Sequence, residues 1–256
     1  MNNIDNLFVE SFNAFREEIL RINKEKLLLN EVNFYQKAIE LAYKDAEFRT
    51  VKGHNSVNKE EVINKIAYVF EKYINSDSDK DNITLIEEVE KILQNDLEGD
   101  GKKQSFGKAQ KIVNMGFKYF YCLDQSRNNR KYDNNKRDIP LDKNILDFYY
   151  SYRRKLKIEN DKIISSWSKI TRKDYIEVQD NLKKYIKNLI SKKHIKDLKF
   201  EMSPIKAEFI IWNYAMANSV NTTYESAKKN YYKLKEPNNP SDKCYKEIKK
   251  LLKKIR

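Results

Sequence analysis

Glycine and proline are scarce in this chain of 256 residues, which holds 5 Gly and 4 Pro. β-Sandwiches and barrels need many tight turns, and glycine and proline commonly supply them. The scarcity therefore favours a few long elements over many short strands. Aromatic residues make up 12% of the chain, which is more than disordered polypeptides carry, so we expect a folded core.

Cysteine is nearly absent as well. Cys122 and Cys244 lie too far apart in the sequence for a disulfide framework or a metal-binding knuckle. Cys122 falls in an apolar stretch and is predicted to be a small core residue, as expected in the reducing cytoplasm. No run of 18 apolar residues occurs, and the first residues lack the basic and apolar regions of a signal peptide. The sequence therefore predicts a cytoplasmic protein with no membrane partner.

The common catalytic and cofactor motifs are missing. The chain has no P-loop, G-x-G-x-x-G, G-x-S-x-G or H-E-x-x-H sequence, so phosphoryl transfer, dinucleotide cofactors, serine hydrolysis and zinc-protease chemistry have no support. His54 and His194 have no carboxylate or cysteine neighbour at the spacing of a metal site. We expect neither a cofactor nor a metal.

One acidic segment follows the spacing of a calcium-binding loop. Asp77, Asp79, Asp81 and Glu88 stand at loop positions one, three, five and twelve, but Asn82 replaces the required glycine. A solvated turn before a helix explains these residues more simply.

Apolar residues recur at spacings of three and four over most of the chain, which predicts an all-α, multi-helix globular protein. Asn58 with Glu61 and Thr84 with Glu87 are predicted to begin two of the helices. The other helices are expected over 4–48 in two runs, 106–123, 143–155, 160–190, 205–217, 222–234 and 244–256.

The breaks between these helices suggest two helical lobes with a cleft. The expected units are an N-terminal lobe over 1–98, a central lobe over 105–234 that carries the candidate site, and a linker with a basic helix over 235–256. Packing on the domain is the simplest role for that last helix.

Positive charge dominates the composition. Lys and Arg total 51 against 38 Asp and Glu, which gives a formal net charge of +13. Such an excess attracts polyanions and speeds encounter with them, so nucleic acid, and DNA first, is the expected partner. A solvated surface on a lysine-rich chain is the alternative interpretation. The sequence indicates no oligomeric state.

The segment over 106–142 offers the best candidate for chemistry. Lys111 stands near the start of an apolar helix, where loss of solvation would make its amine a better nucleophile. Asp142 follows a proline turn, where it can cap the next helix and be pinned at the helix start. A lysine nucleophile opposite a fixed carboxylate suits attack at a sugar C1′.

At these residues the chain resembles the helix-hairpin-helix DNA glycosylases. Lys111-Ile112-Val113-Asn114 and, 31 residues after the lysine, Pro140-Leu141-Asp142 follow the order of that family, with a spacing similar to its archaeal 8-oxoguanine branch. The resemblance implies that Lys111 is the Schiff-base nucleophile and Asp142 the catalytic carboxylate of a base-excision enzyme. It also implies an extrahelical base held between two helical subdomains.

The family's hairpin usually reads G-x-G-x-Lys, whereas the segment over 105–111 holds a single glycine, Gly107. Lys108 is therefore a second candidate for the reactive lysine.

Basic residues around this segment are predicted to bind phosphates. Tyrosines at 149, 150 and 152 stand beside basic residues in the sequence, as in protein surfaces that stack on nucleobases. The predicted nucleic-acid-binding residues are Lys108, Arg127, Arg130, Lys131, Arg137, Lys143, Arg153 and Arg154.

Two other interpretations stay open. In the first, Lys111 is a surface lysine, Asp142 is only an N-cap, and the protein is a non-catalytic helical nucleic-acid-binding protein of phage or mobile-element type. In the second, it is a helical protein-interaction module whose charge is incidental.

Overall fold

The computed structural model describes residues 8–9, 11–13, 15–17, 33–50, 56–76, 81–96, 105–124, 137–153, 164, 166–192 and 203–218. Within these residues all regular structure is α-helix or 3-10 helix, and no strand is present. The prediction of an all-α fold is confirmed.

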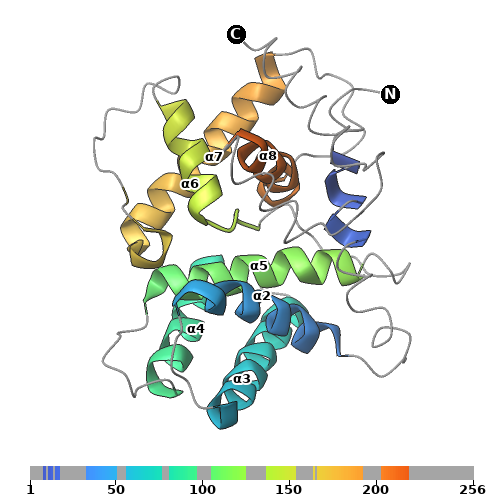
Figure 1. Cartoon of the computed structure of the whole chain (residues 1–256), viewed down its shortest axis with the longest axis vertical. Coiled ribbons are helices and arrows are strands. Elements are labelled where there is room, and N and C mark those ends of the chain that lie inside the picture. Colours follow the sequence, from blue (N-terminus) through green and yellow to red (C-terminus); the bar gives the residue numbers. More distant parts are fainter. Residues whose placement is uncertain are drawn as a thin grey trace.

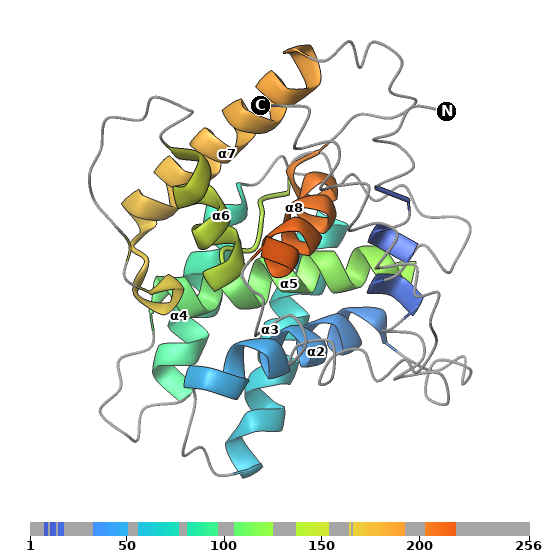
Figure 2. The same ribbon diagram turned by 45° about the horizontal axis from the view of Figure 1, so that its top comes forward.

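The described helices form two layers on either side of a central helix, α5 (Figure 1). The helices below α5 in this view are α2 (Phe34–Thr50), α3 (Ser56–Asn75) and α4 (Asn82–Asp96). The helices above it are α6 (Lys143–Arg153), α7 (Arg172–Lys192) and α8 (Pro204–Asn218), and Figure 2 shows the same order after a turn of the molecule. A short 3-10 helix, η2 (Trp167–Lys169), contacts α5 (Phe106–Asp124).

Burial on all sides distinguishes α5. From Phe106 to Leu123 only Lys111 and Tyr121 are half-buried, and every other residue is buried. Phe120 stacks on Tyr35 of α2 with ring centroids 4.8 Å apart, and Phe117 lies 4.9 Å from Phe70 of α3. Neighbouring elements thus cover α5 on almost every side, and the prediction of a central, largely buried helix is confirmed.

A single hydrophobic core joins the two layers. Phe209 of α8 is surrounded by three aromatic residues of the N-terminal helical segment, with centroid distances of 6.2 Å to Phe8, 5.5 Å to Phe12 and 5.4 Å to Phe15. Cys122 is a buried free thiol whose pKa is raised by burial, which confirms its assignment to the core.

Two predicted helix starts are wrong. α3 begins at Ser56, so Asn58 lies inside the helix and does not cap it. α4 begins at Asn82, and the carboxylate of Asp81, not Thr84, accepts a hydrogen bond from the N–H of Ile83 at 3.1 Å. An aspartate accepts hydrogen bonds from free N–H groups, and its negative charge interacts favourably with the positive end of the helix dipole. It therefore stabilises the helix start more than a threonine three residues later would.

The later helices follow the prediction more closely. α6, α7 and α8 overlap the expected ranges, and Pro204 opens α8 as its first residue. The expected helices over 222–234 and 244–256 lie outside the described residues, as do His54, His194, Asp77 and Asp79 and the proposed lobe boundary near residue 100. No helix in the described part of the chain is long and apolar enough to cross a membrane.

Two glycines of α5 allow close approach of other elements. A Cβ atom on Gly107 would lie 2.8 Å from the backbone carbon and 2.9 Å from the carbonyl oxygen of Ser168 in η2. A Cβ atom on Gly116 would lie 2.8 Å from Cδ1 of Ile39, the mobile end of a side chain. The first neighbour is backbone and cannot rotate away, whereas the second can.

We therefore expect Gly107→Ala to lower the free energy of unfolding by about 1–3 kcal/mol through overpacking. Gly116→Ala should stay within about 1 kcal/mol of the wild type, because the gain in helix propensity offsets a small shift of Ile39. Urea unfolding of both variants measures the difference. Equal stability of the two variants would contradict the close packing of α5 on η2.

Candidate functional site

The irregular segment Arg137–Asp142 runs between α5 and α7, and residues 138–141 within it are buried. Buried backbone N–H and C=O groups need hydrogen-bond partners, and an isolated segment has no neighbouring strand to supply them. Two glutamine side chains, one from each helix, take this role.

We call these contacts the glutamine clamp. Gln110 of α5 donates from Nε2 to the carbonyl of Leu141 at 2.8 Å and accepts from the N–H of Leu141 at 3.2 Å. Gln179 of α7 makes the same pair of bonds with Ile139, at 2.6 and 3.2 Å. Pro140 lies between them and has no N–H to satisfy. Each side-chain amide thus supplies the hydrogen bonds that a neighbouring strand would otherwise supply.

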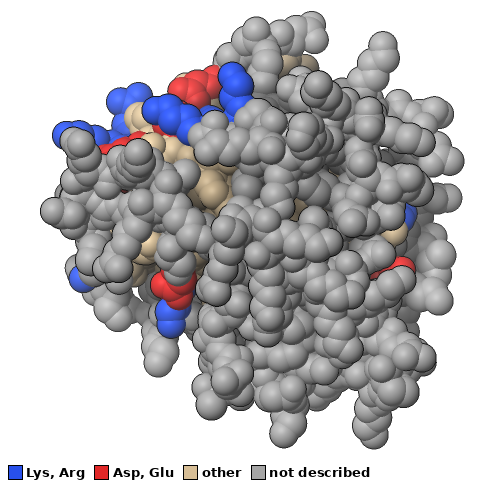
Figure 3. Space-filling view, turned by 90° about the horizontal axis from the view of Figure 1, so that it is seen from above, with Lys and Arg blue, Asp and Glu red and all other residues tan. Residues whose placement is uncertain are grey.

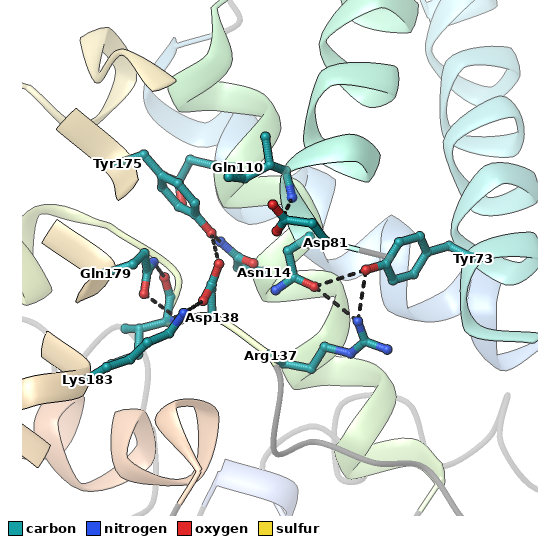
Figure 4. Close-up of polar contacts among 12 residues, drawn as sticks. Tyr73, Asp81, Gln110, Asn114, Arg137, Asp138, Tyr175, Gln179 and Lys183 are labelled. Carbon is teal, nitrogen blue, oxygen red and sulfur yellow. Dashed lines mark hydrogen bonds and ion pairs between the residues drawn. The ribbon is translucent and has the colours of Figure 1, made fainter. Parts of the chain in front are cut away.

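The start of the segment is fixed by charged and polar side chains (Figure 4). Asp138 accepts a hydrogen bond from the hydroxyl of Tyr175 at 2.9 Å and pairs with Lys183 at 2.8 Å. Asn114 donates to the same Tyr175 oxygen at 2.9 Å. Burial, and then the charge of Asp138, raise the pKa of Tyr175 well above its usual value, so the hydroxyl stays protonated and donating.

Arg137 ties the segment to the lower layer. Its guanidinium donates to the hydroxyl of Tyr73 at 3.1 Å and to Oδ1 of Asn82 at 3.0 Å, and it lies 4.6 Å from the ring centroid of Phe117. This predicted phosphate-binding residue therefore already serves packing between α3, α4 and α5.

The two predicted catalytic residues each follow a residue of the clamp, since Lys111 follows Gln110 and Asp142 follows Leu141. Asp142 caps α6, and its Oδ1 accepts from the N–H of Ile145 at 2.9 Å, as predicted. The Lys111 ammonium is half-buried and lies 4.6 Å from the ring centroid of Trp167. Lys111 and Asp142, both among the described residues, form no direct ion pair with each other.

The charges of both residues act on Asp45, and the charges of Lys118 and Asp142 act on Glu208. We call these five residues the charged cluster: Asp45, Lys111, Lys118, Asp142 and Glu208. Burial raises the pKa of Asp45, and the charge of Asp142 adds to this effect. The hydrogen bond from Tyr119 at 2.6 Å and the charges of Lys111 and Lys118 oppose it.

Lys118 and Glu208 form the buried part of the charged cluster. The Lys118 ammonium lies 2.7 and 3.0 Å from the two oxygens of Glu208, and each side chain is 1% exposed. The rings of Phe15, Phe209 and Trp212 surround the ammonium, with centroids at 4.1, 4.8 and 5.2 Å. Burial raises the pKa of Glu208, although Lys118 opposes the shift.

The sequence prediction missed Asp45, Lys118 and Glu208. A signal for two of them existed, because Lys118 and Glu208 stand in the two most apolar helices, α5 and α8. Charged side chains inside apolar helices are seldom buried unless they are paired.

The remaining predicted residues are scattered. Lys108 is buried in the first turn of α5, and Lys143 is exposed at the start of α6. Arg127, Arg130, Lys131 and Arg154 lie outside the described residues, as does the side chain of Arg153.

The tyrosines predicted to stack on bases serve packing where they are described. Tyr149 is buried and accepts from Asn181 at 3.2 Å, and Tyr150 is half-buried and accepts from the N–H of Ile164 at 2.6 Å. In the part of the chain that the structure describes, no group of three or more His, Cys, Asp or Glu residues is arranged to hold a metal ion.

The chain matches no protein-family model, no curated protein and no solved structure. The resemblance to the helix-hairpin-helix glycosylases therefore stays a prediction, carried by the residues quoted above.

The clamp generates a stability prediction. In Gln110→Leu, both backbone groups of Leu141 lose their partners while the side-chain volume hardly changes, so we expect a loss of about 2–4 kcal/mol in the free energy of unfolding. Gln36→Leu is the control, because Gln36 is exposed and hydrogen-bonds only to Asn64 through its side chain. That change should cost no more than about 0.5 kcal/mol. A Gln110→Leu protein as stable as this control would contradict the clamp.

The buried ion pair between Lys118 and Glu208 generates a second stability prediction. Lys118→Met leaves Glu208 charged and unpaired, so we expect a loss of about 3–5 kcal/mol. Adding Glu208→Leu should restore most of that loss, because two apolar side chains can replace a buried pair. A double-mutant cycle by urea unfolding measures the coupling. Additive losses would show that the two charges do not stabilise one another.

Proposed function

We propose that this protein is a base-excision enzyme of the DNA glycosylase/AP lyase type, with Lys111 as its nucleophile and Asp142 as the electrostatic partner. One observation carries the proposal. The hydrogen bonds between Gln110 and Leu141 hold the backbones next to Lys111 and Asp142 together, and both charges act on the same carboxyl group, Asp45.

The chemistry uses groups that lie in the charged cluster. Lys111 releases a proton, and its amine attacks C1′ of the deoxyribose. The bond from C1′ to the base breaks, and the base leaves with the electron pair of that bond. The C1′–O4′ bond then breaks, O4′ leaves with its electron pair and takes up the second proton of the amine, and an imine forms between Lys111 and C1′. The carboxylate of Asp142, held by Ile145, stabilises the positive charge that develops on the sugar. We assign Asp45, on which the charge of Lys111 acts, as the final acceptor of this proton. Lys111 and Asp45, both among the described residues, form no ion pair, so the proton moves between them through solvent.

A non-catalytic nucleic-acid-binding protein is the second candidate, favoured by a specific observation. Asp142 has a complete structural role as the N-cap of α6, and Lys111 packs on Trp167. Both residues can therefore be explained by stability alone.

Borohydride trapping on duplex DNA with a single abasic site separates the two candidates. We expect the wild type to form a covalent adduct, Lys111→Ala to form none, and Lys108→Ala to retain it, because the imine forms only on the reacting amine. Asp142→Asn keeps a good helix cap but removes the charge, so trapping should slow by about 10²-fold without a comparable loss of stability.

The absence of an adduct from the wild type, with salt-sensitive DNA binding intact, would remove the lyase reaction and favour the binding protein. An adduct that persists in Lys111→Ala and disappears in Lys108→Ala would assign the reaction to the other lysine.

A further inference from the structure

Exposed charge is distributed unevenly over the described helices. On α3 the lysines at 59, 65 and 72 are balanced by glutamates at 60, 61 and 71, and on α4 glutamates outnumber the single lysine. On α7 the exposed residues are mostly cationic, with Glu177 and Asp180 as the acidic residues on the solvent side. The cations are Arg172, Lys173, Lys183, Lys184 and Lys187.

Figure 3 shows one face of the molecule, and most of the described Lys and Arg side chains that are visible on it lie at the upper left, with acidic groups among them.

Five of the exposed residues of α7 form one row, which we call the α7 stripe: Lys173, Ile176, Asp180, Lys184 and Lys187. Their spacings of three and four place them on one helix face, about 21 Å long at the rise of an α-helix. Within the described residues the three lysines of the stripe form no ion pair, whereas Arg172 pairs with Glu87 at 3.0 Å. The charge of these lysines is therefore available to a partner.

The stripe is held at a fixed orientation by the opposite face of the same helix. Val178, Leu182 and Ile186 are buried in the core, and Gln179 is bound to the backbone of Ile139. α7 therefore cannot roll to present another face without breaking the glutamine clamp.

The residue types of the stripe and of the rest of α7 indicate which kind of polyanion the helix can bind. A helix that lies in a membrane surface needs an exposed apolar face. Among the α7 side chains that the structure describes, the apolar ones are buried apart from Ile176. Single-stranded nucleic acid needs exposed aromatic rings for stacking, and both tyrosines of α7, Tyr175 and Tyr185, are buried. Double-stranded nucleic acid presents regularly spaced phosphates, so binding to its backbone needs neither an exposed apolar face nor exposed aromatic rings.

The planar polar side chains that read bases are engaged elsewhere in the described part of α7. Bases are read in a groove mainly by Arg, Lys, Asn and Gln side chains, and of these Lys also binds phosphates as a point charge. On α7, Gln179 is buried in the clamp, Asn181 donates to Tyr149, and Arg172 pairs with Glu87.

We propose that the α7 stripe is a docking surface for the phosphate backbone of duplex nucleic acid and binds it without regard to sequence. The choice of DNA as the duplex rests on the proposed function. The row of lysines, which form no ion pair within the described residues, on a helix whose opposite face is buried carries the rest of the proposal.

The test compares two variants with equal loss of charge. One carries Lys173→Gln, Lys184→Gln and Lys187→Gln, and the control carries Lys65→Gln, Lys72→Gln and Lys91→Gln on exposed positions of α3 and α4. Binding to an intact DNA duplex is measured by fluorescence anisotropy over a series of salt concentrations. The stripe variant should lose about tenfold or more in affinity at low salt, and its salt slope should fall by about 0.9 for each phosphate contact removed. The control should keep the wild-type slope.

Equal losses in both variants would overturn the proposal, because net charge rather than the stripe would then govern binding. Binding of the wild type to anionic vesicles that is lost in the stripe variant, with duplex binding unchanged, would also overturn it and assign the stripe to a membrane.

The outcome is independent of the lyase reaction, because an intact duplex has no abasic site. If no adduct forms on abasic DNA but the stripe variant loses binding, the enzyme proposal fails and the docking surface stands.

Discussion

Two glutamine amides make it possible to bury a piece of irregular backbone in the centre of an all-helical protein. Without Gln110 and Gln179, the N–H and C=O groups of Ile139 and Leu141 would lie in the core with no partners, at a cost that few apolar contacts offset. Because the two amides come from α5 and α7, the same bonds fix the relative position of these helices. The position of Asp142, and with it the start of α6, follows from this arrangement.

The polar residues of α5 show how one helix aligns several neighbours. Gln110 binds the irregular segment, Asn114 binds Tyr175 of α7, and Lys118 binds Glu208 of α8, each within an otherwise apolar surface. Apolar contacts supply most of the free energy of burial but tolerate small shifts, whereas each of these polar contacts is satisfied in one arrangement only. We infer that they select the relative positions of α5, α7 and α8.

Local features of this protein were predictable from its sequence, and distant contacts were not. The helices followed from apolar periodicity, and the cap at Asp142 followed from a proline turn, because both depend on residues a few positions apart. The starts of α3 and α4 were misplaced because several residues near each start are capable of capping. The partnership of Lys118 with Glu208, 90 positions later, and of Gln110 with Leu141, 31 positions later, depends on how the helices pack. Asp45 was missed for the same reason.

The glutamine clamp also bears on association between molecules. Ile139, Pro140 and Leu141 form a short apolar run, and such a run with free backbone groups is a template for pairing with a strand of another chain. Here the side-chain amides occupy the N–H and C=O groups of Ile139 and Leu141, and Pro140 has no N–H to offer. The folded protein thus presents no open edge at this run, because its backbone groups are both buried and hydrogen-bonded.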